Sequence, residues 1–286
     1  MPDQQRYLAD HITEAFHEGN QIFIQGQQSK SFLAREQQGK ILSTNEHNGV
    51  ISYEPSELVV TARSGTGINE LQGLLAEHKQ TLAFDPPCFK GIGTIGGTVA
   101  SGLSGPSRPW TGSARDFVLG CSVINGKGET LKFGGQVIKN VAGYDASRLM
   151  VGAFGTLGLV LDISLKVLPL PEMTLTQQLE SSADEAIELV NRMSRKSLPI
   201  SGACWVDNLL YLRISGSEAG VSAAREVIGG ETFDNPEFWT SIRDHQHAFF
   251  ADDYWRIAVP PATPMLPLEG QWTVSYTHLR AHETND

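Results

Sequence analysis

The placement of glycine is the feature of this sequence that most limits what it can fold into. Of the 29 glycines in 286 residues, sixteen lie between Gly91 and Gly158. They show no every-third-residue period, which excludes a collagen helix. Residues 85–115 are rich in Gly, Pro, Ser and Thr, and a loop of this length in a compact chain is usually functional or disordered. Apolar side chains such as Phe89 and Trp110 favour an ordered, functional loop.

Residues 91–96 within this block match the string GxGxxG, which occurs in dinucleotide-binding βαβ folds. That fold needs a strand before the string and a helix after it. Pro86 and Pro87 precede the string, and paired prolines do not fit a central strand. Gly102 and Pro106 would interrupt a long helix after it. The string therefore does not indicate a Rossmann site.

Composition and cysteine placement exclude several classes of protein. The chain carries 22 Lys and Arg against 32 Asp and Glu, a formal net charge of −10, whereas nucleic-acid-binding domains are normally basic. Cys88, Cys121 and Cys204 are far apart and odd in number, which argues against a disulfide framework or a cysteine-bound zinc or iron–sulfur site. Residues 1–20 lack the pattern of a signal peptide, and no run of about 18 apolar residues occurs. We expect a cytoplasmic protein with reduced cysteines.

Residues 1–171 have the pattern of an α+β domain. Apolar spacing predicts a helix over residues 7–16 that closes at Gly19, and a second helix that begins at residue 66 or 67 and ends near residue 79. Strands are expected at residues 22–24, 41–42, 50–53, 58–62, 116–124, 129–133 and 159–168. Shorter features are a hairpin turn at 125–128, a helical turn at 98–100, a loop at 139–144 and a short helix over 146–151 capped by Asp145. The Pro-Leu-Pro run at 169–171 marks a domain boundary.

The second part of the chain alternates strands and helices in a different order. Strands are expected at residues 175–179, 202–206, 209–214 and 255–259, and helices at 184–195 and 218–228. The order strand–helix–strand–strand–helix–strand is that of the ferredoxin-like fold. This part is therefore expected to form an α/β layer next to the first domain.

Two loops of the first domain are suited to holding a phosphate through the main chain. One covers residues 26–30, directly after a predicted strand, and the other covers residues 94–105. Backbone N–H groups in such loops can converge on an anion without a side-chain charge. Either loop alone is consistent with an ordinary turn, but together they suggest a pyrophosphate held from two sides.

The order of the glycine-rich segments resembles the FAD domain of the vanillyl-alcohol-oxidase type, also called the PCMH type. The matching segments are 24–30 (IQGQQSK), 93–102 (GTIGGTVASG), 112–120 (GSARDFVLG), 134–145 (GGQVIKNVAGYD) and 155–158 (GTLG). Residues 104–110 (SGPSRPW) and 139–145 narrow the resemblance to the FAD-binding E subunits of bacterial glycolate oxidases. The similarity runs from residue 21 to residue 261.

The resemblance implies an α+β fold with a PCMH-type FAD-binding domain, residues 1–171, followed by a truncated ferredoxin-like α/β cap domain, residues 172–273. The FAD domain would consist of two α+β subdomains, residues 1–62 and 63–171, around an extended FAD. The implied cofactor-binding residues are Gly26, Gln27, Ser29 and Lys30 in the first loop; Thr94, Gly96, Gly97 and Ala100 opposite it; Gly102, Gly112, Ser113 and Asp116 around the flavin; and Gly158 and Val160 near the adenosine. Glycine suits positions where the backbone approaches a cofactor.

One departure from the family bears on how FAD is held. The first loop reads Gln-Gln-Ser where many members have Gly-Gly-Thr or a histidine. With no histidine in that loop, non-covalent FAD is expected. His11, His17 and His47 form no cluster in sequence and are expected at the surface.

The family implies that flavin carries the redox step while the protein orients and tunes it. A 2-hydroxy acid also needs a cation for its carboxylate and a base near its hydroxyl. The candidate residues in the flavin half are Arg108, Arg115, Lys139, Tyr144 and Arg148, for which pairing with Asp116 or Asp145 is an equal alternative. His245 and His247 have the i, i+2 spacing of a strand metal site but no evident third ligand. We name no catalytic base and expect no metal.

By resemblance, the expected function is oxidation of glycolate to glyoxylate within a complex. The implied partners are a larger flavoprotein subunit and an iron–sulfur subunit that receives the electrons, and these partners could hold the chain at the inner face of the membrane. Two alternatives stay open. One is a self-sufficient FAD-dependent dehydrogenase for a 2-hydroxy acid such as D-lactate, and the other is a non-catalytic scaffold subunit with structural FAD.

The last residues do not continue the family pattern. Residues 274–286 resemble translated adapter sequence more than protein, and we exclude them from fold reasoning. Relatives continue past Trp272 with further sequence. The second domain is therefore expected to be incomplete, and a genuine divergent tail is the alternative.

Overall fold

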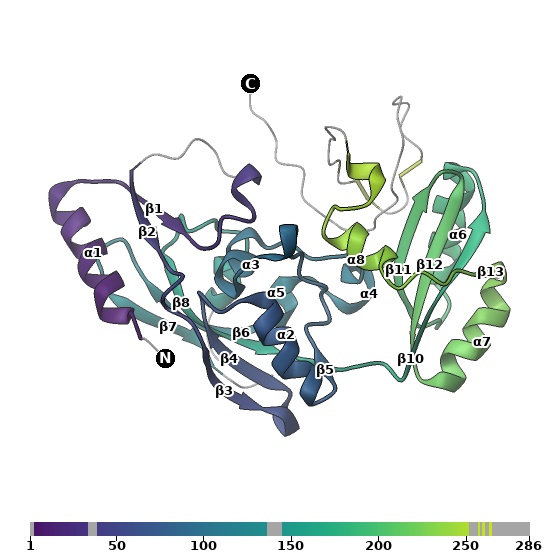
Figure 1. Cartoon of the computed structure of the whole chain (residues 1–286), viewed down its shortest axis with the longest axis horizontal. Coiled ribbons are helices and arrows are strands. Elements are labelled where there is room, and N and C mark those ends of the chain that lie inside the picture. Colours follow the sequence, from purple (N-terminus) through teal and green to yellow (C-terminus); the bar gives the residue numbers. More distant parts are fainter. Residues whose placement is uncertain are drawn as a thin grey trace. The chain divides into compact units, whose positions relative to one another are not determined.

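The computed structural model describes residues 3–33, 39–135 and 145–251, together with residues 257, 259, 260, 263 and 264. The chain divides into two compact units. The first comprises residues 1–103 and 113–170, and the second comprises residues 104–112 and 171–286. Figure 1 labels the helices and strands of both units.

The first unit is built on a five-stranded sheet of order β3-β4-β8-β6-β7, in which neighbouring strands are antiparallel. Its strands are β3 Val50–Glu54, β4 Val59–Arg63, β6 Val118–Ile124, β7 Thr130–Gly134 and β8 Leu159–Lys166. Separate pairs join β1 Ile22–Gln25 to β2 Lys40–Ser43 and β5 Gln80–Thr81 to β9 Leu168–Pro169. The helices are α1 Gln5–Glu18, α2 Ile68–Glu77, α3 Ile95–Ser101 and α5 Ala114–Phe117, with 3-10 turns η1 Ser31–Leu33, η2 Pro55–Glu57, η3 Phe89–Gly91 and η4 Ala146–Met150. The expected subdomain boundary near residue 62 falls within β4.

Strand β8 is buried on both faces and contributes to two cores. Leu159 and Leu161 pack with α1 and with the β1–β2 pair. Ile163 and Leu165 belong to the larger core, which α2 and α3 also build. This arrangement fixes the short parallel pair, and the loop that follows β1, against the central sheet.

Helix α1 forms where apolar side chains recur at helical spacing. Leu8, Ile12 and Ala15 are its buried residues, whereas Tyr7 and Phe16 are exposed. Gly19 ends it at φ +71°, a left-handed conformation that glycine adopts without a Cβ penalty. The predicted helix and its end are confirmed.

Helix α3 is longer than the helical turn predicted at residues 98–100. It begins at Ile95 because the Thr94 side chain accepts a hydrogen bond from the Gly97 N–H at 3.1 Å, which satisfies a donor that a helix start leaves open. Ile95 and Val99 are fully buried in the larger core. Two glycines in its first turn hid this helix from propensity arguments.

The hairpin predicted across residues 125–128 is confirmed by the antiparallel pairing of β6 and β7. The Asn125 side chain makes the turn, since its Oδ1 accepts from the N–H groups of Lys127 and Glu129. Asp145 precedes the 3-10 turn η4, but its side chain makes no capping hydrogen bond with the backbone and is instead engaged by the side chains of Ser147 and Arg148. The predicted loop at 139–144 lies entirely in the stretch 136–144, outside the described residues.

The second unit has a four-stranded antiparallel sheet of order β11-β12-β10-β13. Its elements are α4 Arg108–Thr111, β10 Met173–Glu180, α6 Ala183–Ser194, β11 Ile200–Val206, β12 Leu209–Gly216, α7 Glu218–Ile228, β13 Glu231–Thr232, α8 Phe238–Arg243 and the 3-10 turn η5 Ala248–Phe250. This is the predicted ferredoxin-like order. The fourth strand is β13, however, and the predicted strand at 255–259 lies largely outside the described residues, with Ile257 and Val259 in no strand.

Both faces of this second sheet are covered. Helices α6 and α7 pack Val190, Val221 and Ile228 against one face. On the other, Phe238 and Trp239 of α8 pack with Tyr211. Among the helices that the structure describes, none is both long and apolar enough to cross a membrane.

Candidate FAD-binding site

The first loop presents a row of open backbone donors directly after β1. The N–H groups of Gly26, Gln27, Gln28 and Ser29 make no hydrogen bond with any described residue. Gln28 takes a left-handed conformation at φ 60°, and the Ser31 N–H bonds to the Gln28 carbonyl at 3.2 Å. A run of free N–H groups around a left-handed residue is the main-chain arrangement that receives anions.

Around the start of the second loop, the N–H groups of four residues already have acceptors. The Ile95 N–H bonds to the Thr66 carbonyl and the Gly96 N–H to the Ser64 carbonyl. The Gly97 N–H is held by Thr94 and the Gly93 N–H by the Gln27 side chain. These bonds fix the start of the second loop as a wall, whereas the N–H groups of residues 26–29 stay open.

The two loops touch at several points within the first unit. A Cβ at Gly26 would lie 2.9 Å from Thr94 Oγ1, so only glycine permits this approach. The Gly93 N–H donates to Gln27 Oε1 at 2.7 Å. A Cβ at Gly93 would stand 3.4 Å from Ser29 Oγ and 3.5 Å from Lys30 Nζ. The structure therefore brings together Gly26, Gln27, Ser29, Lys30 and Thr94, as the sequence predicts.

Lys30 adds a positive charge beside the open N–H groups. Its ammonium lies 3.5 Å from Ser29 Oγ and 5.7 Å from the centre of the Phe89 ring. Phe32 stacks edge-on against the same ring at 5.3 Å. The aromatic contacts position the cation at the junction of the two loops.

The remaining predicted residues of α3 are explained by close packing. A Cβ at Gly96 would lie 2.6 Å from Ser64 Cβ, and Gly97 approaches Thr94 Oγ1. The Ala100 carbonyl accepts from the Phe154 N–H at 2.9 Å. Gly102 ends α3 at φ +64°, where a Cβ would lie 3.2 Å from Gly152. These contacts fix α3 between the first loop and residues 151–154.

Ser113 and Asp116 are engaged with each other. Ser113 donates to Asp116 Oδ2 from its N–H at 2.8 Å and its hydroxyl at 2.9 Å, which makes a capping box for α5. Gly112 belongs to the second unit, where its N–H bonds to the Arg108 carbonyl.

Gly158 and Val160 lie in and next to β8. A Cβ at Gly158 would lie 2.6 Å from the Ile124 carbonyl oxygen, so the approach of β6 requires glycine there. Val160 is 8% exposed and belongs to the larger core. No described contact joins either residue to the first loop.

The candidate residues for binding a carboxylate have different surroundings. Arg148 Nε lies 2.8 Å from Asp145 Oδ2, which is the ion pair that the sequence offered as an alternative. The Arg115 side chain is exposed and has no partner among the described residues. Arg108 belongs to the second unit, while Lys139 and Tyr144 lie outside the described residues.

The histidines near residue 246 make local contacts. His245 stacks on Phe250 at 4.4 Å, and His247 Nδ1 accepts from the Phe249 N–H at 3.2 Å. Within the described part of the chain, no group of three or more His, Cys, Asp and Glu side chains is arranged to hold a metal.

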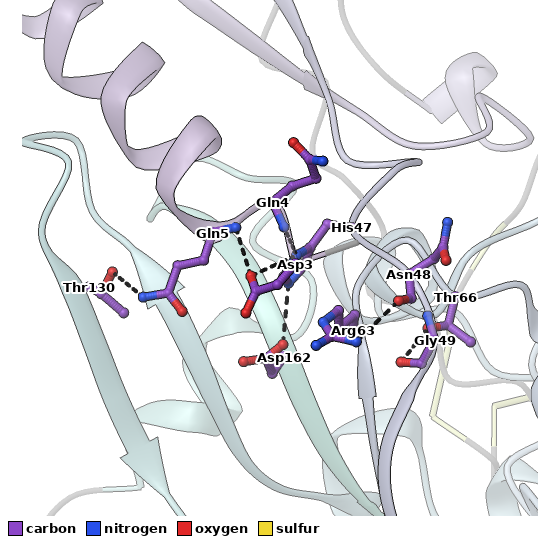
Figure 2. Close-up of polar contacts among 10 residues, drawn as sticks. All are labelled: Asp3, Gln4, Gln5, His47, Asn48, Gly49, Arg63, Thr66, Thr130 and Asp162. Carbon is purple, nitrogen blue, oxygen red and sulfur yellow. Dashed lines mark hydrogen bonds and ion pairs between the residues drawn. The ribbon is translucent and has the colours of Figure 1, made fainter. Parts of the chain in front are cut away.

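The expectation that His47 lies at the surface is wrong. Its side chain is 2% exposed, and its Nε2 lies 3.2 Å from Asp162 Oδ1 (Figure 2). Its Nδ1 accepts from the Gln4 N–H at 3.2 Å and lies 3.8 Å from Asp3 Oδ1. The reason is tertiary, since β8 and the start of α1 meet over the loop after β2.

Comparison with known proteins shows the family to which the chain belongs. Residues 1–134 match the FAD binding domain family. The chain is 44% identical over 276 residues to the glycolate oxidase subunit GlcE of Escherichia coli K12, which covers 96% of the chain and 79% of that protein. This chain belongs to the GlcE family. The match to the FAD binding domain family, together with this kinship, shows that the chain is an FAD-binding oxidoreductase and that FAD is its cofactor.

More distant relatives match parts of the chain or the fold alone. The D-lactate dehydrogenase of Anaerostipes hadrus is 33% identical over 48% of the chain, and the match spans 29% of that protein. Alkyldihydroxyacetonephosphate synthase superposes with a TM-score of 0.69 at 15% identity, covering 86% of this chain and 57% of that one. The predicted PCMH-type fold is confirmed for this GlcE homologue.

The residues present fit FAD. The open N–H groups of the first loop and the Lys30 ammonium complement the negative charge of a pyrophosphate. Gly26 and Gly93 keep side chains out of the space between the loops. The donor set therefore suits the phosphate part of the cofactor.

Sequence reasoning missed the residues that fix the wall of the site. The carbonyls of Ser64 and Thr66 hold the first turn of α3, and Gly65 allows this because a Cβ there would lie 2.2 Å from the Thr44 carbonyl oxygen. The Ser-Gly-Thr-Gly run at 64–67 was the available signal. The contact of the Gln27 side chain with Gly93 had no signal in the sequence.

Proposed function

We propose that this chain is the FAD-binding subunit of a glycolate oxidase complex that converts glycolate to glyoxylate. The observation that carries the proposal is the 44% identity to the E. coli glycolate oxidase subunit over 96% of the chain. The open main-chain donors of the first loop supply the matching chemistry for the cofactor.

The proposed FAD site uses the two loops of the first unit. The N–H groups of residues 26–29 and the Lys30 ammonium bind the pyrophosphate, while Thr94 and α3 form the opposite wall. Gly96, Gly97 and Ala100 stay assigned to that wall. Gly102, Gly112, Ser113 and Asp116 stay assigned to the flavin, and Gly158 and Val160 to the adenosine. FAD is held without a covalent bond, because the loop contains no histidine.

Bound FAD would accept the two electrons and the hydrogen of the C–H bond that breaks when the alcohol carbon of glycolate becomes the aldehyde carbon of glyoxylate, while the hydroxyl proton passes to a base. The chain's own residues bind and orient that cofactor. We propose that the electrons then pass to an iron–sulfur subunit, and that a larger flavoprotein subunit completes the complex. The word subunit in the relative's name supports such partners.

Co-purification tests this function. The tagged full-length chain, expressed in its native host, should carry two further subunits and show the visible absorption bands of flavin. Glycolate should bleach those bands, and the complex should reduce an artificial acceptor. Isolation of a chain without flavin, or a complex inert toward glycolate, would contradict the proposal.

D-Lactate is the second candidate substrate, because the Anaerostipes hadrus relative is a D-lactate dehydrogenase. A comparison of kcat/KM for glycolate and D-lactate decides between them, with glycolate expected to be higher. A complex that keeps full activity after losing this chain's FAD would instead support a scaffold role.

A matched pair of glycine variants tests the site. Gly26→Ala places a Cβ 2.9 Å from Thr94 Oγ1 and pushes the loops apart. Gly73→Ala in α2 adds a Cβ that meets nothing within 4 Å. We expect Gly26→Ala to weaken FAD binding about tenfold, equal to ~1.4 kcal/mol, and Gly73→Ala to leave the Kd unchanged. If both variants bind FAD with the same Kd, the first loop is not part of the FAD site.

A further inference from the structure

We propose that the Gln27 side chain is a strut that sets the spacing of the two FAD loops before the cofactor binds. The inference rests on the proposed FAD site and adds a positioning residue to it. Gln27 reaches from the first loop to the second, and its Oε1 accepts the Gly93 N–H at 2.7 Å. The two residues are 66 positions apart in sequence.

The far end of the strut is rigid. The Gly93 carbonyl accepts the Ile68 N–H at 2.9 Å, and Ile68 is fully buried at the start of α2. Thr94 follows directly, paired in a β-bridge with Gly67. A hydrogen bond to Gly93 therefore ties the first loop to the framework of α2 and α3.

The near end of the strut has few other restraints. Gln27 and Gln28 are exposed, and the backbone N–H groups of residues 26–29 bond to nothing described. The carbonyl oxygen of the Gln27 side chain makes the cross-loop bond, so its backbone N–H stays open for the ligand. One residue thus supplies both a donor to the anion and the bond that positions neighbouring donors.

The same contact has an opposite interpretation that an experiment can separate. If Gln27 Oε1 occupied the place of a phosphate oxygen at the Gly93 N–H, it would have to leave when FAD binds. Removing the amide would then tighten FAD binding. As a strut, its removal weakens binding, because the loop must be ordered by the cofactor itself.

The test compares Gln27→Met with Gln21→Met in the full chain. Methionine keeps the length of the side chain and removes the amide acceptor, and Gln21 is an exposed glutamine just before β1, outside both loops, with no described side-chain bond. In FAD-free protein, Gln27→Met should speed hydrogen exchange of the Gly93 amide about fivefold, as loss of a ~1 kcal/mol hydrogen bond predicts. FAD titration should give a Kd about three- to fivefold higher. Gln21→Met should change neither quantity.

Two results would overturn the strut. If Gln27→Met leaves the hydrogen exchange of the Gly93 amide unchanged, the bond does not hold the two loops together. If the variant binds FAD more tightly than the wild type, the Gln27 side chain obstructs the cofactor. The Gly93 measurement needs no FAD, so it fails or succeeds independently of the proposed function. Failure of the site itself would appear instead as wild-type FAD affinity in Gly26→Ala.

Discussion

At the scale of single residues, His47 links three parts of the first unit that are distant in sequence. Because the Gln4 N–H donates to Nδ1, the proton of the neutral ring sits on Nε2 and points to Asp162. The His47 carbonyl also accepts the Gly65 N–H at 2.8 Å, and Gly65 begins the turn that holds α3. This buried ring therefore supports the wall of the cofactor site from behind.

Replacing His47 tests that support. His47→Ala removes two side-chain hydrogen bonds at a nearly fully buried position, and we expect a loss of about 2–3 kcal/mol in the free energy of unfolding. His17→Ala, at an exposed position of α1, should stay within about 0.5 kcal/mol of the wild type. Urea unfolding of FAD-free protein measures both, and equal values for the two variants would contradict a structural role for His47.

Buried thiols make stability depend on alkaline pH. Burial, with a smaller effect of the Asp145 carboxylate, raises the pKa of Cys121 to about 12, whereas an unfolded thiol titrates near pH ~8.5. The native state keeps the proton that the unfolded chain releases, so this contribution is complete below the unfolded pKa and declines as pH rises toward the native one.

The difference between wild type and Cys121→Ala isolates this effect. Relative to the variant, the wild type should lose about 1.4 kcal/mol of unfolding free energy between about pH 7.5 and 9.5. Urea unfolding at both pH values gives the difference, and Cys204, whose pKa burial also raises, serves as a second case with the same sign. A difference that does not change with pH would mean that the Cys121 thiol is solvated.

At the scale of elements, helix α3 depends on its cap. Thr94 holds the Gly97 N–H, and its hydroxyl also faces Gly26 across the site. Thr94→Ala should cost about 1 kcal/mol, while Thr94→Ser keeps the acceptor and most of the stability. Urea unfolding of FAD-free protein compares them, and a serine variant as unstable as the alanine variant would show that the methyl group matters more than the cap.

The same helix marks the limit of what the sequence could predict. The hairpin at Asn125 was predictable because its turn chemistry is local, and α1 because its apolar spacing and Gly19 agree. Helix α3 was hidden, since its start depends on carbonyls of Ser64 and Thr66, about thirty residues earlier. For the site, the order of the sequence motifs was enough to predict which two loops are involved. It was not enough to predict which N–H groups stay open, because this depends on hydrogen bonds between residues far apart in sequence.

At the scale of the whole molecule, the two units have separate hydrophobic cores, and their unfolding can be followed by different measurements. Helix α4 carries Trp110 into the second unit, where it packs on the core of the ferredoxin-like sheet. All five tryptophans, at positions 110, 205, 239, 255 and 272, fall within the residue ranges of the second unit. Tryptophan fluorescence therefore follows that unit, whereas the proposed pyrophosphate loops lie in the first.

FAD should consequently stabilise the two units unequally. At a free concentration of 100 times its Kd, a ligand adds about 2.7 kcal/mol to the state that binds it. We expect FAD to slow hydrogen exchange in peptides from β8 and α3. We expect it to stabilise the second unit less, as measured by the urea midpoint of tryptophan fluorescence. Gly26→Ala at the same FAD concentration is the control; with a tenfold weaker Kd it should lose about half of the added stabilisation of β8 and α3, about 1.3 of 2.7 kcal/mol. An equal gain by both reporters would contradict this expectation and would mean that the two units unfold as one cooperative body.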